Sequence, residues 1–275
     1  MTRTTSLLVF TDLDGTLLGS EDYAYAAAVP LLERLVNEGI PVIPVTSKTR
    51  QEVETLRQQI GLRDPFVVEN GSAIYIPRSQ TQFQLPDGED VGDYRVAQLG
   101  CSYVVARAAL KAIAQELGRP LKGFGDWTVE QVEQMTGLAH QDAQQAKARE
   151  FSEPFMTPKN VETATLVAAV EDFGFRVVVG DRFSHLIGGE AGKGAAVHRL
   201  TELYKATLPT GSTVTTVGLG NSPNDLDMLE NVQIPIVVPG QKGPHPQLAD
   251  RGWQVAPAPA PEGWAQALEA TLATL

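Results

Sequence analysis

The sequence predicts an α/β protein: a doubly wound, Rossmann-like parallel sheet with an α+β unit inserted into it. Two observations support this fold class. Short apolar runs typical of strands alternate with helical patterns over residues 6–76, and the alternation resumes after residue 193. Between these stretches the alternation breaks, first at residues 77–93, a polar segment with several prolines and glycines that is typical of a domain boundary.

The first stretch begins with an apolar strand at residues 6–11. A helix is expected next at residues 24–38, where apolar side chains recur at helical spacing before Gly39, a common helix stop. The other expected elements here are a strand at 40–46, a helix at 49–60, and two strands within 65–76 that turn at Asn70 and Gly71. Pro41 and Pro44 weaken the strand at 40–46, because proline has no N–H for a sheet ladder.

The inserted unit is expected to mix strands with helices. Its expected elements are a strand at 94–99, a helix at 102–117, two short helices around 128–147, a strand at 151–156, a helix at 160–172, and strands at 175–179 and 183–187. The first pattern then returns as a helix at 193–206, a strand at 213–219, a helix at 223–230, a strand at 234–238 and a last helix at 262–273. We therefore expect a discontinuous core domain of residues 1–80 and 188–275 around an inserted domain of residues 81–187.

Composition limits the class of protein. The chain has 275 residues, 43% of them apolar, and this is enough for a full hydrophobic core. The formal charge of −11 argues against a partner that is nucleic acid or an anionic membrane surface. A single cysteine, Cys101, excludes an intramolecular disulfide and a cysteine-rich zinc site. No apolar run resembles a signal peptide or a membrane span, so we expect a cytoplasmic protein; the sequence does not specify an oligomeric state.

Polar side chains gather where the predicted parallel strands end. Asp12 and Asp14 follow the first strand, Thr46 follows the second, and residues 218–225 close a later one, while Lys193 opens a helix. The carboxyl ends of parallel strands share one edge of the sheet, where ligands bind. Carboxylates, a hydroxyl, a lysine and helix N-termini at one edge suit a phosphoryl group with Mg²⁺.

Each of these signals has a simpler explanation when it stands alone. A single D-x-D pattern usually caps a helix or makes a turn, and the segment after Thr46 would serve as a helix cap. The segment GGEAGKG (188–194) resembles a nucleotide-binding loop, but its spacing is wrong and Gly194 stands where Ser or Thr should hold Mg²⁺. We therefore reject the nucleotide interpretation and rely on the combination and order of the segments.

In this order the segments resemble the haloacid dehalogenase (HAD) superfamily of phosphotransferases, over residues 6–80 and 188–273. The resemblance implies a HAD core with an α+β cap and a small substrate enclosed between them. It implies Asp12 as the nucleophile that forms an aspartyl-phosphate and Asp14 as the general acid and base. Thr46 and Lys193 would bind the phosphoryl oxygens, while Asp12, Asp14, Asn221 and Asp225 would hold Mg²⁺.

Further segments in both domains look like the mannosyl-3-phosphoglycerate phosphatase family, including its glucosyl-specific forms. They are VFTDLDGTLL (9–18), PVIPVTSKTR (41–50), VVENGSAIY (67–75), GFGDWT (123–128) with MTGL (135–138), AKAREFSEPF (146–155), GDRFSHL (180–186), AGKGAAV (191–197) and GLGNSPNDLDML (218–229). The implied function is Mg²⁺-dependent hydrolysis of mannosyl- or glucosyl-3-phosphoglycerate to a compatible solute. The alternatives are another HAD sugar phosphatase, similar to sucrose phosphatase or acting on hexose phosphates, and a non-catalytic phosphosugar-binding protein.

The resemblance also provides candidate substrate contacts and one departure. The candidates are Ser47, Lys48, Asn70, Arg149, Arg182 and His185; the arginines suit the carboxylate of a phosphoglycerate. Asn221 stands where the family pattern has aspartate. Its amide oxygen can be a neutral metal ligand with weaker Mg²⁺ binding, or Asn221 caps the helix that begins near Pro223. The sequence leaves both interpretations open.

Overall fold

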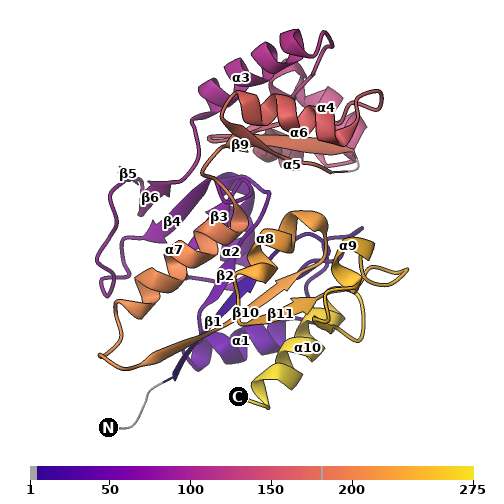
Figure 1. Cartoon of the computed structure of the whole chain (residues 1–275). Helices are drawn as coiled ribbons and strands as arrows, with labels where there is room; N and C mark the ends of the chain where they lie inside the picture. The colour runs from indigo at the N-terminus through magenta and orange to yellow at the C-terminus, as the bar shows by residue number, and fades with distance from the viewer. Residues whose placement is uncertain (1–4, 181) are drawn as a thin grey trace.

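The computed structural model describes residues 5–180 and 182–275. Residues 1–4 of the predicted core domain, and Asp181 of the segment GDRFSHL, lie outside them. Two bodies are visible in Figure 1, one above the other, and the chain crosses from the lower to the upper body and back. Within the described part, no helix combines the length and apolar character needed to cross a membrane.

The lower body takes its elements from both halves of the chain. From the first half come β1 (Thr5–Thr11), α1 (Val29–Asn37), β2 (Val42–Pro44), α2 (Arg50–Ile60), β3 (Phe66–Val68), β4 (Ala73–Pro77), β5 (Glu89–Val91) and β6 (Tyr94–Gln98). From the second half come α7 (Lys193–Lys205), β10 (Thr213–Gly220), the 3₁₀ turn η2 (Pro223–Asp225), α8 (Leu226–Glu230), β11 (Ile234–Val237), α9 (Pro246–Ala249), β12 (Gln254–Val255) and α10 (Glu262–Leu272).

The central sheet of this body is parallel, as the sequence predicts. Its strand order is β12-β11-β10-β1-β2, so β1 lies between β10 and β2, and Thr11 at its end pairs with Leu219 and Pro44. The alternate side chains of β1 enter two separate cores on opposite faces: Val9 packs in one, and Leu8 and Phe10 pack in the other. All three are fully buried. The carboxyl ends of β10, β1 and β2 therefore lie side by side.

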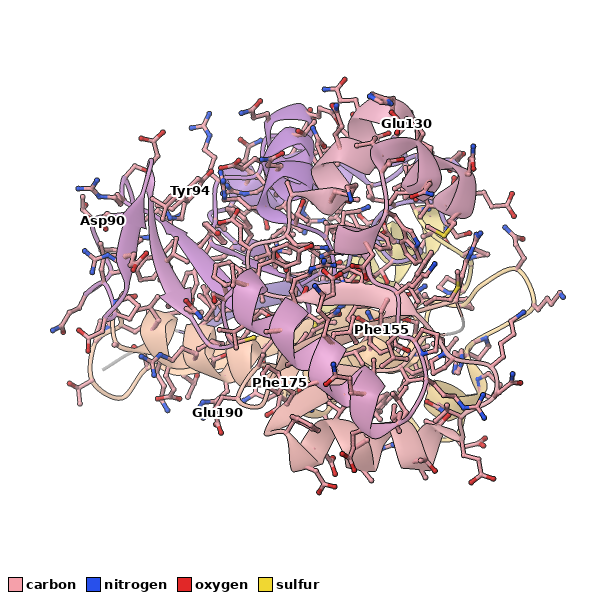
Figure 2. All side chains as sticks on the ribbon, turned by 90° about the horizontal axis from the view of Figure 1, so that it is seen from above. Asp90, Tyr94, Glu130, Phe155, Phe175 and Glu190 are labelled. Carbon is pink, nitrogen blue, oxygen red and sulfur yellow. The ribbon has the colours of Figure 1, made fainter. Side chains whose placement is uncertain are left out.

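A second sheet extends the lower body and changes where the inserted unit begins. Strands β3, β4, β6 and β5 pair antiparallel in that order, and an isolated bridge between Val45 and Val67 joins this sheet to the end of β2. The hairpin of β5 and β6, with Asp90 and Tyr94, lies beside β4 and away from the upper body (Figures 1 and 2). We therefore propose that the chain leaves the core near residue 100, rather than near residue 80.

The upper body is an α+β unit. It contains α3 (Tyr103–Glu116), the 3₁₀ turn η1 (Phe124–Asp126), α4 (Val129–Thr136), α5 (His140–Lys147), β7 (Glu153–Met156), α6 (Thr163–Asp172), β8 (Phe175–Val178) and β9 (Phe183–Gly188). Its antiparallel sheet has the order β7-β9-β8. Ile113 of α3 and Leu166 of α6 pack on Phe155 of β7 in one apolar cluster. We call this unit the cap; Figure 2 looks down on it.

The structure corrects several predicted elements. The first helix begins at Val29 instead of residue 24, because residues 24–25 are irregular and residues 26–28 form a turn before it. The segment 77–93, predicted as a linker, contains β5, whose polar sequence carries no apolar signal. The single helix predicted over 223–230 is the turn η2 followed by α8. The short elements η1, α9 and β12 were not predicted, since two to four residues give no periodic pattern.

Candidate active site

The carboxyl ends of three adjacent strands carry the candidate catalytic residues. Asp12 follows β1, Thr46 lies two residues after β2, and Asn221 follows β10. Lys193 is the first residue of α7, where the turn between β3 and β4 supports it. Gly71 in that turn has φ +86°, and a Cβ there would collide with the backbone of Gly192. The close approach of these two glycines places Lys193 at the strand ends.

Lys193 joins two carboxylates at the centre of the site. Its Nζ lies 2.6 Å from Asp12 Oδ1 and 2.6 Å from Asp225 Oδ1. All three side chains are buried. Burial and the neighbouring Asp225 raise the pKa of Asp12 to about 7, although Lys193 opposes the shift. Burial alone would lower the pKa of Lys193, but the two carboxylates outweigh it, so its pKa is raised and it remains an ammonium.

Asp225 is held entirely by protein donors. Its Oδ1 accepts from Lys193, and its Oδ2 accepts from the backbone N–H groups of Asn221 (2.9 Å) and Ser222 (3.0 Å). Both oxygens are therefore engaged without a metal. These contacts fix the loop after β10 and orient Lys193, and the predicted role of Asp225 as a metal ligand stays a prediction.

Asn221 does not cap the turn that follows it. The residue before η2 is Ser222, and the side chain of Asn221 reaches back to β1's loop, where its Oδ1 accepts from the hydroxyl of Thr16 at 3.2 Å. The same hydroxyl lies 3.5 Å from Asp12 Oδ2. Gly15, with φ +71°, makes room for the amide, since a Cβ there would collide with Asn221 Nδ2. Thr16 therefore lies between one oxygen of Asp12 and the oxygen of Asn221.

Asp14 lies beside a second lysine. Lys48 Nζ is 3.0 Å from Asp14 Oδ1 and 3.5 Å from Glu52 Oε1, and it lies 4.9 Å from the ring centre of Tyr23. Burial raises the pKa of Asp14, against the pull of Lys48. A carboxyl group at such a position can serve as a general acid and, once deprotonated, as a general base.

A carboxylate oxygen and an amide oxygen are the donors that the site brings together for a metal ion. Among the described residues, no group of three His, Cys, Asp or Glu side chains is arranged to hold a metal. Asp12 Oδ2 and Asn221 Oδ1, which share the Thr16 hydroxyl, are a carboxylate and an amide oxygen. Mg²⁺ keeps several waters and needs only one or two carboxylates beside a substrate phosphate. These two oxygens therefore fit Mg²⁺ with few protein ligands.

Two cavities separate the cap from the strand ends. One of about 240 Å³ has Ser47 and Asn224 from the core on one side and His185 of β9 on the other. The second, of about 690 Å³, reaches Lys193 and Asn70. Both are also lined by Gly180 at the edge of the cap. The larger space between cap and core thus reaches Lys193 and is large enough for a small substrate.

The predicted substrate contacts divide into two groups. Asn70, Ser47 and His185 line the cavities, and Asn70 Nδ2 is buried without a hydrogen-bond partner. Burial and the nearby Arg149 and Lys193 lower the pKa of His185 to about 3, so its imidazole is neutral. His185 Nδ1 also lacks a partner, which leaves it free to bond a substrate hydroxyl.

The two arginines and Lys48 serve other contacts. Arg149 Nη1 donates to the backbone carbonyl of Ser47 at 2.7 Å, and it holds the loop after β2. Arg182 is exposed, its guanidinium 5.5 Å from the ring centre of Phe183, and it lines neither cavity. Lys48 faces Asp14 and borders a separate cavity of about 170 Å³ with Tyr23. A contact of either arginine with a substrate carboxylate therefore stays a prediction.

Sequence reasoning missed three residues of the site. Thr16 is the first of them, and its hydroxyl joins Asp12 to Asn221. His245 precedes α9, and it lines both cavities while its Nδ1 accepts from the N–H of Gln247. Glu69 is fully buried in the turn before β4. The sequence offered one signal for Glu69, which is a charged residue inside the largely apolar segment PFVVENGSAIY. No local pattern indicated His245.

Comparison with known proteins agrees with this geometry. Residues 9–86 match the family of haloacid dehalogenase-like hydrolases. The chain is 37% identical over 262 residues to the glucosyl-3-phosphoglycerate/mannosyl-3-phosphoglycerate phosphatase of Persephonella marina, and the match covers 95% of this chain and 96% of that protein. The chain belongs to this phosphatase family. Within the family, the mannosyl-3-phosphoglycerate phosphatase of Pyrococcus furiosus is 35% identical over 232 residues, covering 84% of this chain and 90% of that protein.

The fold of this chain agrees with the folds of solved structures. The sucrose-phosphatase of Synechocystis, solved with sucrose and phosphate, superposes with a TM-score of 0.62 at 18% identity over 98% of each chain. At this identity the likeness concerns the fold alone. The predicted fold class, a Rossmann-like α/β core of the HAD type, is confirmed, and the protein is a phosphatase.

Proposed function

We propose that this phosphatase hydrolyses glucosyl-3-phosphoglycerate, mannosyl-3-phosphoglycerate or both, and releases phosphate and the glycosylglycerate. The observation that carries the proposal is the similarity to the Persephonella marina enzyme over 95% of the chain, cap included. The buried arrangement of Asp12, Lys193 and Asp225 beside the cavities between cap and core supports it. We also infer a small-molecule substrate and a cytoplasmic location.

The arrangement supports a two-step reaction through Asp12. A carboxylate oxygen of Asp12 attacks phosphorus, and the bond to the glycerate oxygen breaks with its electron pair on that oxygen, which takes a proton from Asp14. Asp14 then removes a proton from water, which attacks the aspartyl-phosphate and frees Asp12 and phosphate. Lys193 balances the negative charge of the phosphoryl oxygens, and Thr46 hydrogen-bonds one of them.

A bound Mg²⁺ would neutralise charge that Asp12 and the phosphate otherwise present to each other. Asp12 and Asn221 are the side chains that we propose to hold it, with Asp14 next to them. Asp225 instead orients Lys193 and the loop after β10 through its three hydrogen bonds. Thr16 keeps Asp12 and Asn221 on the same side of the site.

The test is phosphate release from a panel of substrates at saturating Mg²⁺. The panel holds both glycosyl-3-phosphoglycerates, 3-phosphoglycerate, sucrose 6-phosphate, glucose 6-phosphate and p-nitrophenyl phosphate. We expect the highest kcat/KM for one or both of the glycosyl-3-phosphoglycerates. The variant Asp12→Asn, nearly isosteric but without the attacking charge, is the control for contaminating phosphatases.

Two results would overturn the proposal. A higher kcat/KM for sucrose or hexose phosphate would assign another sugar phosphatase, and binding of a glycosyl-3-phosphoglycerate without turnover would assign a binding protein. The ratio of the two glycosyl substrates is measured in the same panel, since glucose and mannose differ in the direction of one hydroxyl.

A further inference from the structure

Glu69 is a buried carboxylate that the catalytic steps do not use. It is fully buried, and its side chain accepts three hydrogen bonds from one short cap segment. Oε1 accepts from the N–H of Glu150 (2.8 Å); Oε2 accepts from the N–H of Phe151 (3.2 Å) and the hydroxyl of Ser152 (2.6 Å). We call residues 149–152 the clasp segment; it lies between α5 and β7 of the cap.

The backbone of the same turn holds the loop that carries Thr46. The N–H of Asn70 donates to the carbonyl of Thr46 (2.9 Å), and the N–H of Glu69 donates to the carbonyl of Lys48 (2.9 Å). Between them, the carbonyl of Ser47 accepts from Arg149 Nη1 of the clasp segment (2.7 Å). Three successive carbonyls of the loop are thus fixed, two by the turn and one by the cap.

The backbone at Glu69 has an uncommon conformation. Its φ is +51°, and that of Asn70 is +58°, a region that residues other than glycine seldom adopt. Such a conformation persists only where the surrounding contacts enforce it. Here the enforcing contacts come from both sides, the loop 46–48 below and the clasp segment above.

Further contacts keep the clasp segment on the core. Glu150 Oε2 accepts from the hydroxyl of Tyr75 (2.9 Å), and its Oε1 accepts from Arg50 Nε (2.8 Å). The hydroxyl of Thr49, the residue before α2, donates to the carbonyl of Gln145 in the cap (2.9 Å). The loop 46–49 and the cap therefore share one continuous hydrogen-bond network, with Glu69 at its centre.

We propose that Glu69 is a positioning residue, which couples the docking of the cap to the geometry of the loop carrying Thr46, Ser47 and Lys48. With the clasp segment docked, the loop holds Thr46 and Lys48 beside the strand ends. When the clasp segment is released, Ser47 loses the bond from Arg149 and the turn loses its support. The part of this proposal that concerns catalysis rests on the proposed function.

Glu69→Gln tests the coupling. The amide keeps the shape but replaces one acceptor oxygen with a donor, so at least one of the three donors from residues 150–152 is left without a partner. We expect faster amide hydrogen exchange in peptides covering both 149–152 and 46–50. We expect kcat to fall about 10²-fold, the scale of a misplacement of about 1 Å, with little change in KM. The fall should affect p-nitrophenyl phosphate as much as the sugar substrate.

Glu153→Gln is the matched control. Glu153 is also a fully buried glutamate, but its Oε1 accepts from Arg107 (3.0 Å) and the N–H of Gly125 (2.9 Å), both inside the cap. Its replacement should leave exchange at 46–50 and kcat close to wild type. Ser152→Ala removes one hydrogen bond to Glu69 and is the milder variant, which serves if Glu69→Gln does not fold. It should shift both readouts in the same direction as Glu69→Gln, but by less.

The two readouts separate this proposal from the proposed function. Unchanged exchange at 46–50 in Glu69→Gln and Ser152→Ala would overturn the coupling, whatever the substrate. An equal change in Glu153→Gln would also overturn it, because any damage to the cap would then suffice. If no substrate is turned over, the proposed function fails, and the exchange measurement still decides the coupling.

Discussion

Lys193 Nζ lies 2.6 Å from Asp12 Oδ1, and both side chains are buried although 181 residues separate them along the chain. Removing the ammonium from between two buried carboxylates is costly, because it leaves buried charge without compensation. The contacts at the centre of the candidate site therefore also join the first and last parts of the core.

Lys193→Met should destabilise the protein as well as remove activity. The change leaves Asp12 and Asp225 facing each other without a cation, and breaking a buried pair in this way costs about 3–5 kcal/mol. The free energy of unfolding from urea titration measures the loss. Lys205→Met at the exposed end of the same helix, where Lys205 contacts Glu202, is the control and should change the free energy by less than about 0.5 kcal/mol. Equal losses would contradict the role of the buried charges.

Asn221→Asp should strengthen Mg²⁺ binding. A carboxylate in place of the amide adds a negative oxygen beside Asp12, and a hard cation gains from it. Titration calorimetry with Mg²⁺ alone measures the dissociation constant, and the Mg²⁺ concentration for half-maximal phosphate release should fall in parallel. Asn37→Asp adds the same charge at an exposed site on α1 and is the control. Identical Mg²⁺ affinity in wild type and Asn221→Asp would exclude Asn221 as a ligand.

His185 should make stability depend on pH. Its pKa is lowered to about 3 in the folded protein, chiefly by burial, from the ordinary value of 6.5. Between these values the unfolded chain binds a proton that the folded protein does not, so stability falls as pH falls through this window. The free energy of unfolding of wild type, relative to His185→Gln, should therefore rise between about pH 4 and pH 7.

The exposed His198 of α7, replaced in the same way, is the control for the loss of one imidazole. A constant difference between wild type and His185→Gln across the range would mean that His185 titrates alike in both states.

Arg149→Ala and Arg182→Ala should differ in a way that separates loop positioning from carboxylate recognition. Because Arg149 donates to the carbonyl of Ser47, its loss should lower kcat about equally for a glycosyl-3-phosphoglycerate and for p-nitrophenyl phosphate. Arg182 stacks on Phe183 at the surface, so its replacement should leave both rates near wild type. A loss confined to the phosphoglycerate substrate would restore the predicted contact with its carboxylate. Steady-state kinetics on the two substrates measures the difference.

Most of the parallel core was predictable from the sequence because its strands other than β12 lie in largely apolar segments. Asp12, Thr46 and Asn221 were predictable as neighbours, since residues after adjacent parallel strands share one edge. The strand at 89–91 was not predictable, because its sequence is polar and it becomes a strand only by pairing with residues 94–96. The contacts of Arg149 and Glu69 depend on the docking of the cap, which joins residues about 80 to 100 positions apart and leaves no local pattern.

The strand order also bears on how the protein is made. Strand β1, which ends just before Asp12, lies between β2 and β10, and β10 follows the whole cap in the chain. At about 5–20 residues per second, a ribosome needs roughly 10–40 s to reach β10 after it has made β1. The whole cap has been synthesised before then, whereas the apolar β1 still lacks β10, one of its two neighbours in the sheet. During synthesis β1 is therefore the exposed edge of an unfinished sheet, and an exposed apolar edge strand favours aggregation until β10 is made.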